Sequence, residues 1–231
     1  MTRELRPLLA LALPTVLAEL GWMVMGAVDT LMVGPLGPAA IGAVSIGRHV
    51  FLTVAVVGLG LLLGLDTLVA QAFGAGDRDD CRRSLVHGIG VALAATPPLM
   101  LAALGAMAAV RHWSVDPQVL EQATSYLHGI IWGTAPLLLY FALRRYLQGM
   151  NVVRPVMLAL VSANAINLFG NWVLVYGKLG APALGVSGSA WATCLSFGYM
   201  AAFLVVAVLL HDRGEGGRLR RMRHVLEPAR L

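Results

Sequence analysis

Charged residues are distributed so unevenly along this chain that their spacing constrains the fold more than any single motif does. Four long stretches contain no Asp, Glu, Lys or Arg at all: 84–110, 122–143, 155–177 and 179–211. Two further stretches, 7–34 and about 49–72, contain three acidic residues in otherwise apolar sequence. A helix of about 20 residues crosses the hydrocarbon core of a bilayer. The sequence therefore predicts six membrane-spanning helices.

The overall composition agrees with this arrangement. Of 231 residues, 58% are hydrophobic and 13% are charged, whereas about 25% of the residues in an average soluble domain are charged. Strands of a membrane barrel would alternate apolar and polar residues over about ten positions, but these stretches are longer and apolar on all faces. The predicted fold is an all-α, polytopic transmembrane bundle. Its six spans form one lobe over residues 1–211, and a basic cytoplasmic tail or linker follows over 212–231. The predicted spans are approximately 7–34, 49–72, 84–110, 122–143, 155–177 and 184–211.

The basic residues indicate how the chain is oriented in the membrane. Fourteen of the 17 Lys and Arg residues lie before the first predicted span, in the loops after the second and fourth spans, or in the tail. The other three are placed on the opposite side: Arg111, Lys178 and Arg48, the last near the start of the second span. Because basic residues concentrate on the cytoplasmic side, we expect a multi-pass protein of the inner membrane with both termini cytoplasmic. The net charge of +5 then reflects topology and attraction to anionic lipid, and no nucleic-acid partner is expected.

Three acidic residues, Glu19, Asp29 and Asp66, lie inside the predicted spans. A charged side chain at the centre of a bilayer costs about 2.5–3.5 kcal/mol on insertion scales, so each needs a partner, a proton or a hydrated cavity. Asp29 lies about 33 Å along a helix that begins at Pro7, and it is the first candidate for a proton- or sodium-responsive site. The alternatives are a packing role for Asp29, an interhelical hydrogen bond for Glu19, and a helix cap or interfacial water for Asp66.

A row of amides in the fifth predicted span supplies possible partners for these acids. Asn164, Asn167 and Asn171 are spaced so that all three project from one helical face. Such a row forms either interhelical hydrogen bonds or the lining of a hydrated pocket. Thr193 in the sixth span joins the same cluster if the first, fifth and sixth helices are neighbours; otherwise its hydroxyl bonds its own helix.

Two turns share one pattern. Residues 34–42 and 177–185 both have the form G-x-L-G-x-x-A-[IL]-G, and each follows an odd-numbered span on the same side of the membrane. The pattern indicates either two hairpins with similar turn residues or a transporter built from duplicated units.

Signals for catalysis or cofactor binding are missing from the sequence. Neither a GxxxxGK[ST] phosphate-binding loop nor a CxxC pair occurs, and Cys81 and Cys194 lie at different depths. The six histidines have no metal-like spacing. We therefore expect no enzymatic activity, no metal and no cofactor, and no direct use of ATP. Four residues could line a drug pocket or face lipid instead: Trp22, Met25, Tyr140 and Trp172.

Several segments, taken in order, resemble the MATE family of multidrug and toxic compound extrusion transporters. They are Ala12-Leu13-Pro14-Thr15 continuing to Val28-Asp29-Thr30, the segment 64–76 (GLDTLVAQAFGAG), the segment 143–149 (LRRYLQG) and the segment 184–193 (LGVSGSAWAT). Together they cover nearly the whole chain.

The resemblance implies two six-helix lobes around a central cavity, with a proton or sodium gradient driving the export of amphipathic cationic compounds. Asp29 matches the family's first-helix carboxylate, Asn167 and Asn171 its fifth-helix positions, and Thr193 its sixth-helix threonine. Where some members of the family have a second aspartate, this chain has Asn171, and in this it resembles the NorM-like branch. Pro14 resembles the proline at which the first helix of the family kinks, although a packing kink is an equal alternative.

The family pattern calls for twelve helices, whereas this chain provides one lobe. We expect the lobe to need a C-terminal six-helix half or a second copy of itself. Besides the exporter, the sequence leaves open a lipid-linked oligosaccharide flippase of a related branch and a non-transporting fragment. A flippase would need a strongly cationic cavity for pyrophosphate, whereas the basic residues are predicted mainly in loops.

Overall fold

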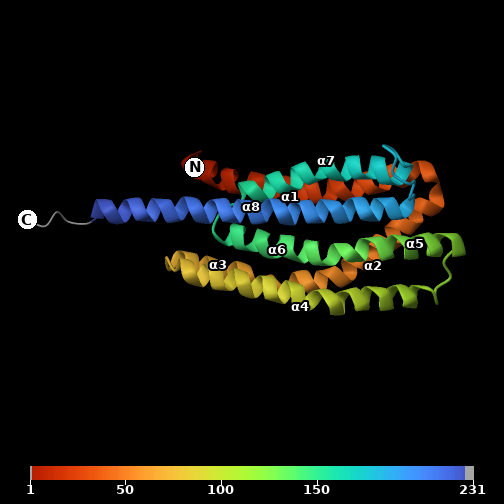
Figure 1. Cartoon of the computed structure of the whole chain (residues 1–231), viewed down its shortest axis with the longest axis horizontal. Helices are drawn as coiled ribbons and strands as arrows, with labels where there is room; N and C mark the ends of the chain where they lie inside the picture. The colour runs from red at the N-terminus through yellow and green to blue at the C-terminus, as the bar shows by residue number, and fades with distance from the viewer. Residues whose placement is uncertain (1, 227–231) are drawn as a thin grey trace, which may run out of the picture.

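The apolar stretches fold into long helices that lie side by side in one bundle (Figure 1). The computed structural model describes the backbone of residues 2–226 and the side chains of residue 13 and residues 16–212. Within that part of the chain the regular structure is helical, with two short 3₁₀ turns, η1 (Gly34–Leu36) and η2 (Ile131–Gly133). The α-helices are α1 (Thr2–Val33), α2 (Pro38–Leu61), α3 (Gly64–Gly74), α4 (Arg78–Val110), α5 (Pro117–Ile130), α6 (Thr134–Gly149), α7 (Arg154–Tyr176) and α8 (Val186–Leu226).

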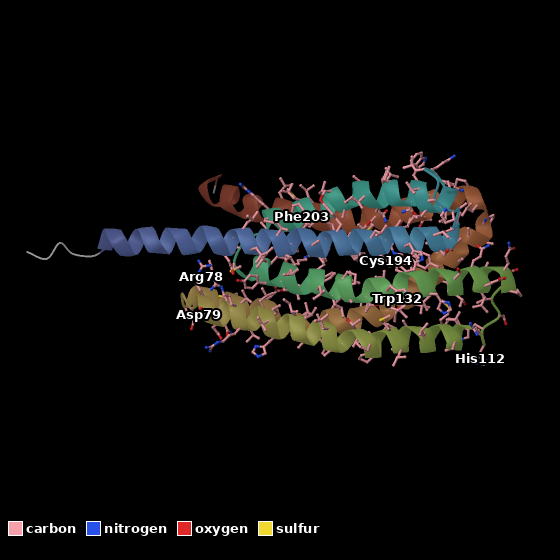
Figure 2. The ribbon with its side chains drawn as sticks, in the orientation of Figure 1. Arg78, Asp79, His112, Trp132, Cys194 and Phe203 are labelled. Carbon is pink, nitrogen blue, oxygen red and sulfur yellow. The ribbon has the colours of Figure 1, made fainter. Side chains whose placement is uncertain are left out.

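Six helical segments are long and apolar enough to cross a membrane, which confirms the predicted number of spans. Two of the six combine consecutive helices, α2 with α3 and α5 with α6. An even number of crossings returns the chain to its starting side, and the start of α1 and the end of α8 lie at the same end of the bundle (Figure 1). Figure 2 shows α4 running between the two ends, with Arg78 and Asp79 at one and His112 at the other.

The second span begins eleven residues earlier than the predicted start at His49. Helix α2 starts at Pro38, whose fixed φ suits the first helical position, and Gly37 before it has φ 109°. Arg48 therefore lies well inside α2 instead of near its start, and the predicted position of Arg48 is wrong. The prediction failed because a span defined by the absence of charge stops at any arginine, even one that the bundle accommodates.

Two spans are interrupted where local sequence weakens the α-helical hydrogen bonding. Between α2 and α3, beside Gly60 and Gly64, backbone hydrogen bonds span three residues instead of the four of an α-helix. One of them joins Leu65 N to Leu62 O at 3.2 Å. Between α5 and α6 the turn η2 precedes Pro136, which has no N–H to donate.

Helix α8 extends beyond the expected end of the lobe. Within the predicted basic tail or linker of residues 212–231, α8 continues without a break to Leu226 and projects past the other helices (Figure 1); the role of this segment stays a prediction. Five of the fourteen residues 213–226 are Arg, which favours helix, and the first proline after residue 211 is Pro228.

The two turns of similar sequence connect α1 to α2 and α7 to α8. Their equivalent glycines, Gly37 and Gly180, both have positive φ, at 109° and 83°, which explains why glycine recurs there. Beside these turns, Tyr176 Oη donates a hydrogen bond to Met32 O at 2.5 Å and joins the ends of α1 and α7. The idea that the turns mark duplicated units remains a prediction.

Candidate coupling site around Asp29

Asp29 is the centre of a buried polar cluster between α1, α7 and α8. Its side chain is 1% exposed. Asn167 Nδ2 and Asn171 Nδ2 each donate to Asp29 Oδ1 at 3.0 Å, and Thr193 Oγ1 donates to Oδ2 at 2.9 Å. The four residues that sequence reasoning grouped are thus in contact in the structure.

The cluster presents hydrogen-bond donors to the carboxylate. Asn171 Nδ2 also lies 3.0 Å from Asn167 O, one turn earlier in α7, and Asn167 Nδ2 lies 3.3 Å from Thr193 Oγ1. An ionised carboxylate only accepts hydrogen bonds, and bonds to it are stronger than those between neutral groups. The arrangement therefore suits a negatively charged Asp29 held by neutral side chains. Asn171 Oδ1 is buried and has no hydrogen-bond partner.

Arg48 approaches the cluster from α2, and sequence reasoning missed it. The guanidinium lies against Gly26 of α1, where a Cβ would overlap its terminal atoms. Arg48 lines the same cavity as Asp29 and Tyr126. Among the side chains that the structure describes, no carboxylate lies within 4.0 Å of it. The one sequence signal was a lone arginine directly before a long apolar run.

Asp29 and Arg48 line the same small cavity. Its polar lining consists of Asp29, Arg48, Tyr126 and Thr193. About 10 Å³ is open to the centre of a water-sized molecule, which is room for about one water. Tyr126 is fully buried, and its hydroxyl has no hydrogen-bond partner.

Aromatic rings close the same cavity. Trp22 stacks on Phe197 with ring centres 5.7 Å apart, and Phe51 stacks on the same ring at 6.4 Å. Of the four pocket candidates from the sequence, Trp22 and Met25 line this cavity. Tyr140 is buried elsewhere in the core, and Trp172 is 40% exposed on the surface.

The other two acids of the spans lie outside the cluster, in ion pairs. Arg144 Nη2 of α6 donates to Glu19 Oε1 of α1. Arg145 Nη1, also of α6, donates to Asp66 Oδ2 of α3 at 2.6 Å. These two secondary candidates therefore connect helices through arginine partners that sequence reasoning did not assign.

Asn164 and Pro14 also lie apart from the cluster. Asn164 Nδ2 donates to Gly21 O of α1 at 3.0 Å and to Leu160 O of its own helix at 2.9 Å. Gly21 precedes Asp29 by eight residues, about 12 Å along a helix, so this amide joins α1 to α7 without reaching the carboxylate. Pro14 lies within α1, but its side chain is outside the described part, so a kink there stays a prediction.

Comparison with known proteins identifies the family. Residues 14–173 match the model of the family described as MatE. The chain belongs to the MatE family. It is 33% identical over 211 residues to the "Multidrug resistance protein NorM" of Photobacterium profundum, covering 91% of this chain and 46% of the relative. It is 35% identical over 191 residues to "Multidrug resistance protein MdtK" of Yersinia pestis, covering 82% and 42%.

This MatE chain therefore spans less than half the length of the curated relatives it matches, and it corresponds to a NorM-like N-terminal half. The fold agrees with solved structures. An outward-facing "multidrug resistance MATE family transporter of the MOP superfamily" superposes with a TM-score of 0.74 at 22% identity, covering 87% of this chain and 44% of that one. A MOP superfamily transporter from Pyrococcus furiosus gives 0.71 at 23%, covering 84% and 42%.

Proposed function

We propose that this MatE chain is one lobe of a secondary active transporter that exports amphipathic cationic compounds, driven by a proton or sodium gradient through Asp29. The observation that carries the proposal is a carboxyl group buried inside a membrane span and held by three neutral donors from two other helices. Ionisable groups in such positions are costly, and they typically mark ion pathways or proton relays.

The hydrogen bonds provide a mechanism by which the occupant of Asp29 changes helix packing. An ionised Asp29 accepts from all three donors, whereas a protonated carboxyl must itself donate one O–H. A bound cation likewise needs oxygen atoms where amide N–H groups now point. A proton on Oδ2 would turn the Thr193 hydroxyl from donor to acceptor, and a bound cation would displace the amide N–H groups, so either occupant changes the hydrogen bonds that join α1 to α7 and α8. Such a change biases the lobe between two packings, as alternating access requires.

The wider setting of this proposal comes from the relatives. The curated relatives named above are called multidrug resistance proteins, and they are more than twice as long as the matched region. We infer that a second six-helix lobe, either a C-terminal half or a second copy, completes the cavity. The end of the bundle that holds both chain ends lies in the cytoplasm, because most basic residues of the sequence belong to that end.

Dye efflux tests this proposal. Cells or inverted vesicles would carry the chain beside a C-terminal NorM-type lobe, with Asp29 intact or replaced in Asp29→Asn. Asp79→Asn is the matched control, because Asp79 is exposed in the first turn of α4. We expect gradient-dependent efflux for the parent and the control, and none for Asp29→Asn at equal amounts of folded protein. Efflux by Asp29→Asn at the parent rate would exclude Asp29 as the coupling group.

The flippase alternative is weaker. It requires a strongly cationic cavity for pyrophosphate, whereas the cavity at Asp29 contains one arginine and one aspartate. Arg144, which is buried, is paired with Glu19. The described interior therefore lacks the excess of positive charge that a pyrophosphate group would need.

A further inference from the structure

Arg48 is an arginine inside a membrane span, and the bundle is shaped to admit it. Gly26 leaves room on α1 for the guanidinium, which a single methyl group would displace. One residue before Arg48, a Cβ at Gly47 would lie 2.7 Å from the Tyr126 ring of α5. Two glycines thus bring α2 close to both α1 and α5. The guanidinium remains charged at any physiological pH.

Asp29 is the acidic residue that lines the same cavity as Arg48, and the other polar groups of the lining are neutral hydroxyls. Tyr126 of α5 and Thr193 of α8 line the same cavity, and the amides of α7 bond Asp29. No other acidic side chain in the described part of the chain lines the cavity. The neighbouring His49 is exposed, and its Nδ1 contacts Ser45 O of the same helix at 2.7 Å. A cation in a span requires such a counter-charge.

We propose that Arg48 is the tethered counter-cation of Asp29 and determines ion specificity: it fills the electrostatic role of a bound metal cation, excludes Na⁺ and leaves the proton as the coupling ion. This inference rests on the proposed coupling role of Asp29. A Na⁺ ion entering a cavity with room for about one water would lie beside a fixed positive charge. A proton adds no separate ion to that space, because it binds to the carboxyl oxygen itself.

The orientation of the amides agrees with this assignment. Both Asn167 and Asn171 turn their NH₂ groups to Asp29, whereas Na⁺ would require oxygen ligands. The groups for such a site are nevertheless close by, since Asn171 Oδ1 has no partner and Thr193 Oγ1 contacts the carboxylate. Removing the charge of Arg48 should therefore create a Na⁺ site at Asp29.

Equilibrium binding of radiolabelled Na⁺ to the purified chain in nanodiscs tests the proposal, with choline chloride keeping ionic strength constant. We expect Arg48→Gln to bind Na⁺ at least about tenfold more tightly than the parent, a difference of about 1.4 kcal/mol. Arg48→Lys keeps the charge and should bind as weakly as the parent. Asp29→Asn added to Arg48→Gln should abolish the gained binding. A purely structural role of Arg48 would not separate Lys from Gln in this way.

Two results would overturn the inference: tight Na⁺ binding by the parent chain, or no gain of binding in a folded Arg48→Gln variant. If circular dichroism shows that Arg48→Gln has lost helix, Arg48→Met, which keeps the aliphatic length, replaces it and carries the same expectation. The measurement needs no transport, so a failed dye-efflux test leaves its outcome readable. Conversely, Na⁺ binding by the parent would reject the role of Arg48 while leaving Asp29 as a sodium-coupled site.

Discussion

The acids of this bundle are held in two different ways. At Asp29, three neutral donors surround a carboxylate that is almost inaccessible, and the nearest cation stays beyond ion-pair distance. Nearer the end of the bundle where α1 starts and α8 ends, Glu19 pairs directly with Arg144 and Asp66 with Arg145. Arg144 and Arg145 each join α6 to another helix through these pairs, whereas the amides and the hydroxyl at Asp29 carry no charge. Under the proposed function the first region is the one that changes state, while the second joins helices through ion pairs.

The largest expected difference between the regions is in transport. Asp29→Asn should reduce the initial rate of gradient-dependent dye efflux at least about tenfold, equivalent to at least about 1.4 kcal/mol. Asp66→Asn should change it less than about threefold, because the amide can still accept from Arg145. Efflux rates at matched membrane levels provide the measurement. Equal losses in both variants would remove the functional distinction.

A smaller effect is expected on stability. Thr193→Val removes the donor to Asp29 Oδ2 without changing side-chain shape, so it should lower the unfolding free energy by about 1–3 kcal/mol. Ser196→Ala is the matched control, since the buried Ser196 hydroxyl bonds only Ala192 O of its own helix. Thermal unfolding in detergent compares the two variants. If Ser196→Ala lowers the unfolding free energy as much as Thr193→Val does, the hydrogen bond to Asp29 contributes no more than an ordinary bond within a helix.

Close packing at Arg48 should also be measurable. Gly26→Ala places a methyl group on the guanidinium and should cost about 1 kcal/mol, at the low end for overpacking because the end of an arginine can move. At Gly90 of α4 nothing lies within 4 Å of an added Cβ, so Gly90→Ala should stabilise by about 0.5–1 kcal/mol. Opposite signs in the thermal midpoints are the expected result, and a stabilising Gly26→Ala would contradict the packing.

The smallest effect is expected at the exposed edge of the ion-pair region. Arg82 Nε lies 3.1 Å from Asp212 Oδ2, with side chains 54% and 28% exposed. Water screens such a pair, so Arg82→Gln should cost about 0–1 kcal/mol. The same unfolding measurement checks it, with high salt as the control condition. If Arg82→Gln lowered the unfolding free energy more than Thr193→Val does, the exposed ion pair would contribute more stability than the buried hydrogen bond, which would contradict the comparison of the two regions.

Much of the candidate site could be predicted from local spacing. Residues four apart share a helix face, so the placement of Asn167 beside Asn171 followed from the sequence alone. The choice of Asp29 followed from the cost of a charge in a span. Asn164 projects from the same face, but it does not join the cluster at Asp29. It lies earlier along α7 and meets α1 at Gly21, eight residues before Asp29.

The missed features depend on long-range packing. Glu19 and Arg144 are 125 residues apart, and no local pattern pairs them. Arg48 was assigned to a span boundary because only the close approach at Gly26 makes an interior arginine tolerable. Sequence periodicity identifies faces of helices, but it does not say which face meets which neighbour or how closely.

Helix α8 connects the two regions that the comparison separates. Thr193 contacts Asp29 near the first turns of α8, and Asp212 of the same uninterrupted helix contacts Arg82. The two contacts are about 28 Å apart along the helix axis. An unbroken helix resists torsion, so a rotation that withdraws the Thr193 hydroxyl also swings Asp212 around the same axis. A change in the Thr193–Asp29 hydrogen bond can thereby alter the contact between Asp212 and Arg82 at the other end of the bundle.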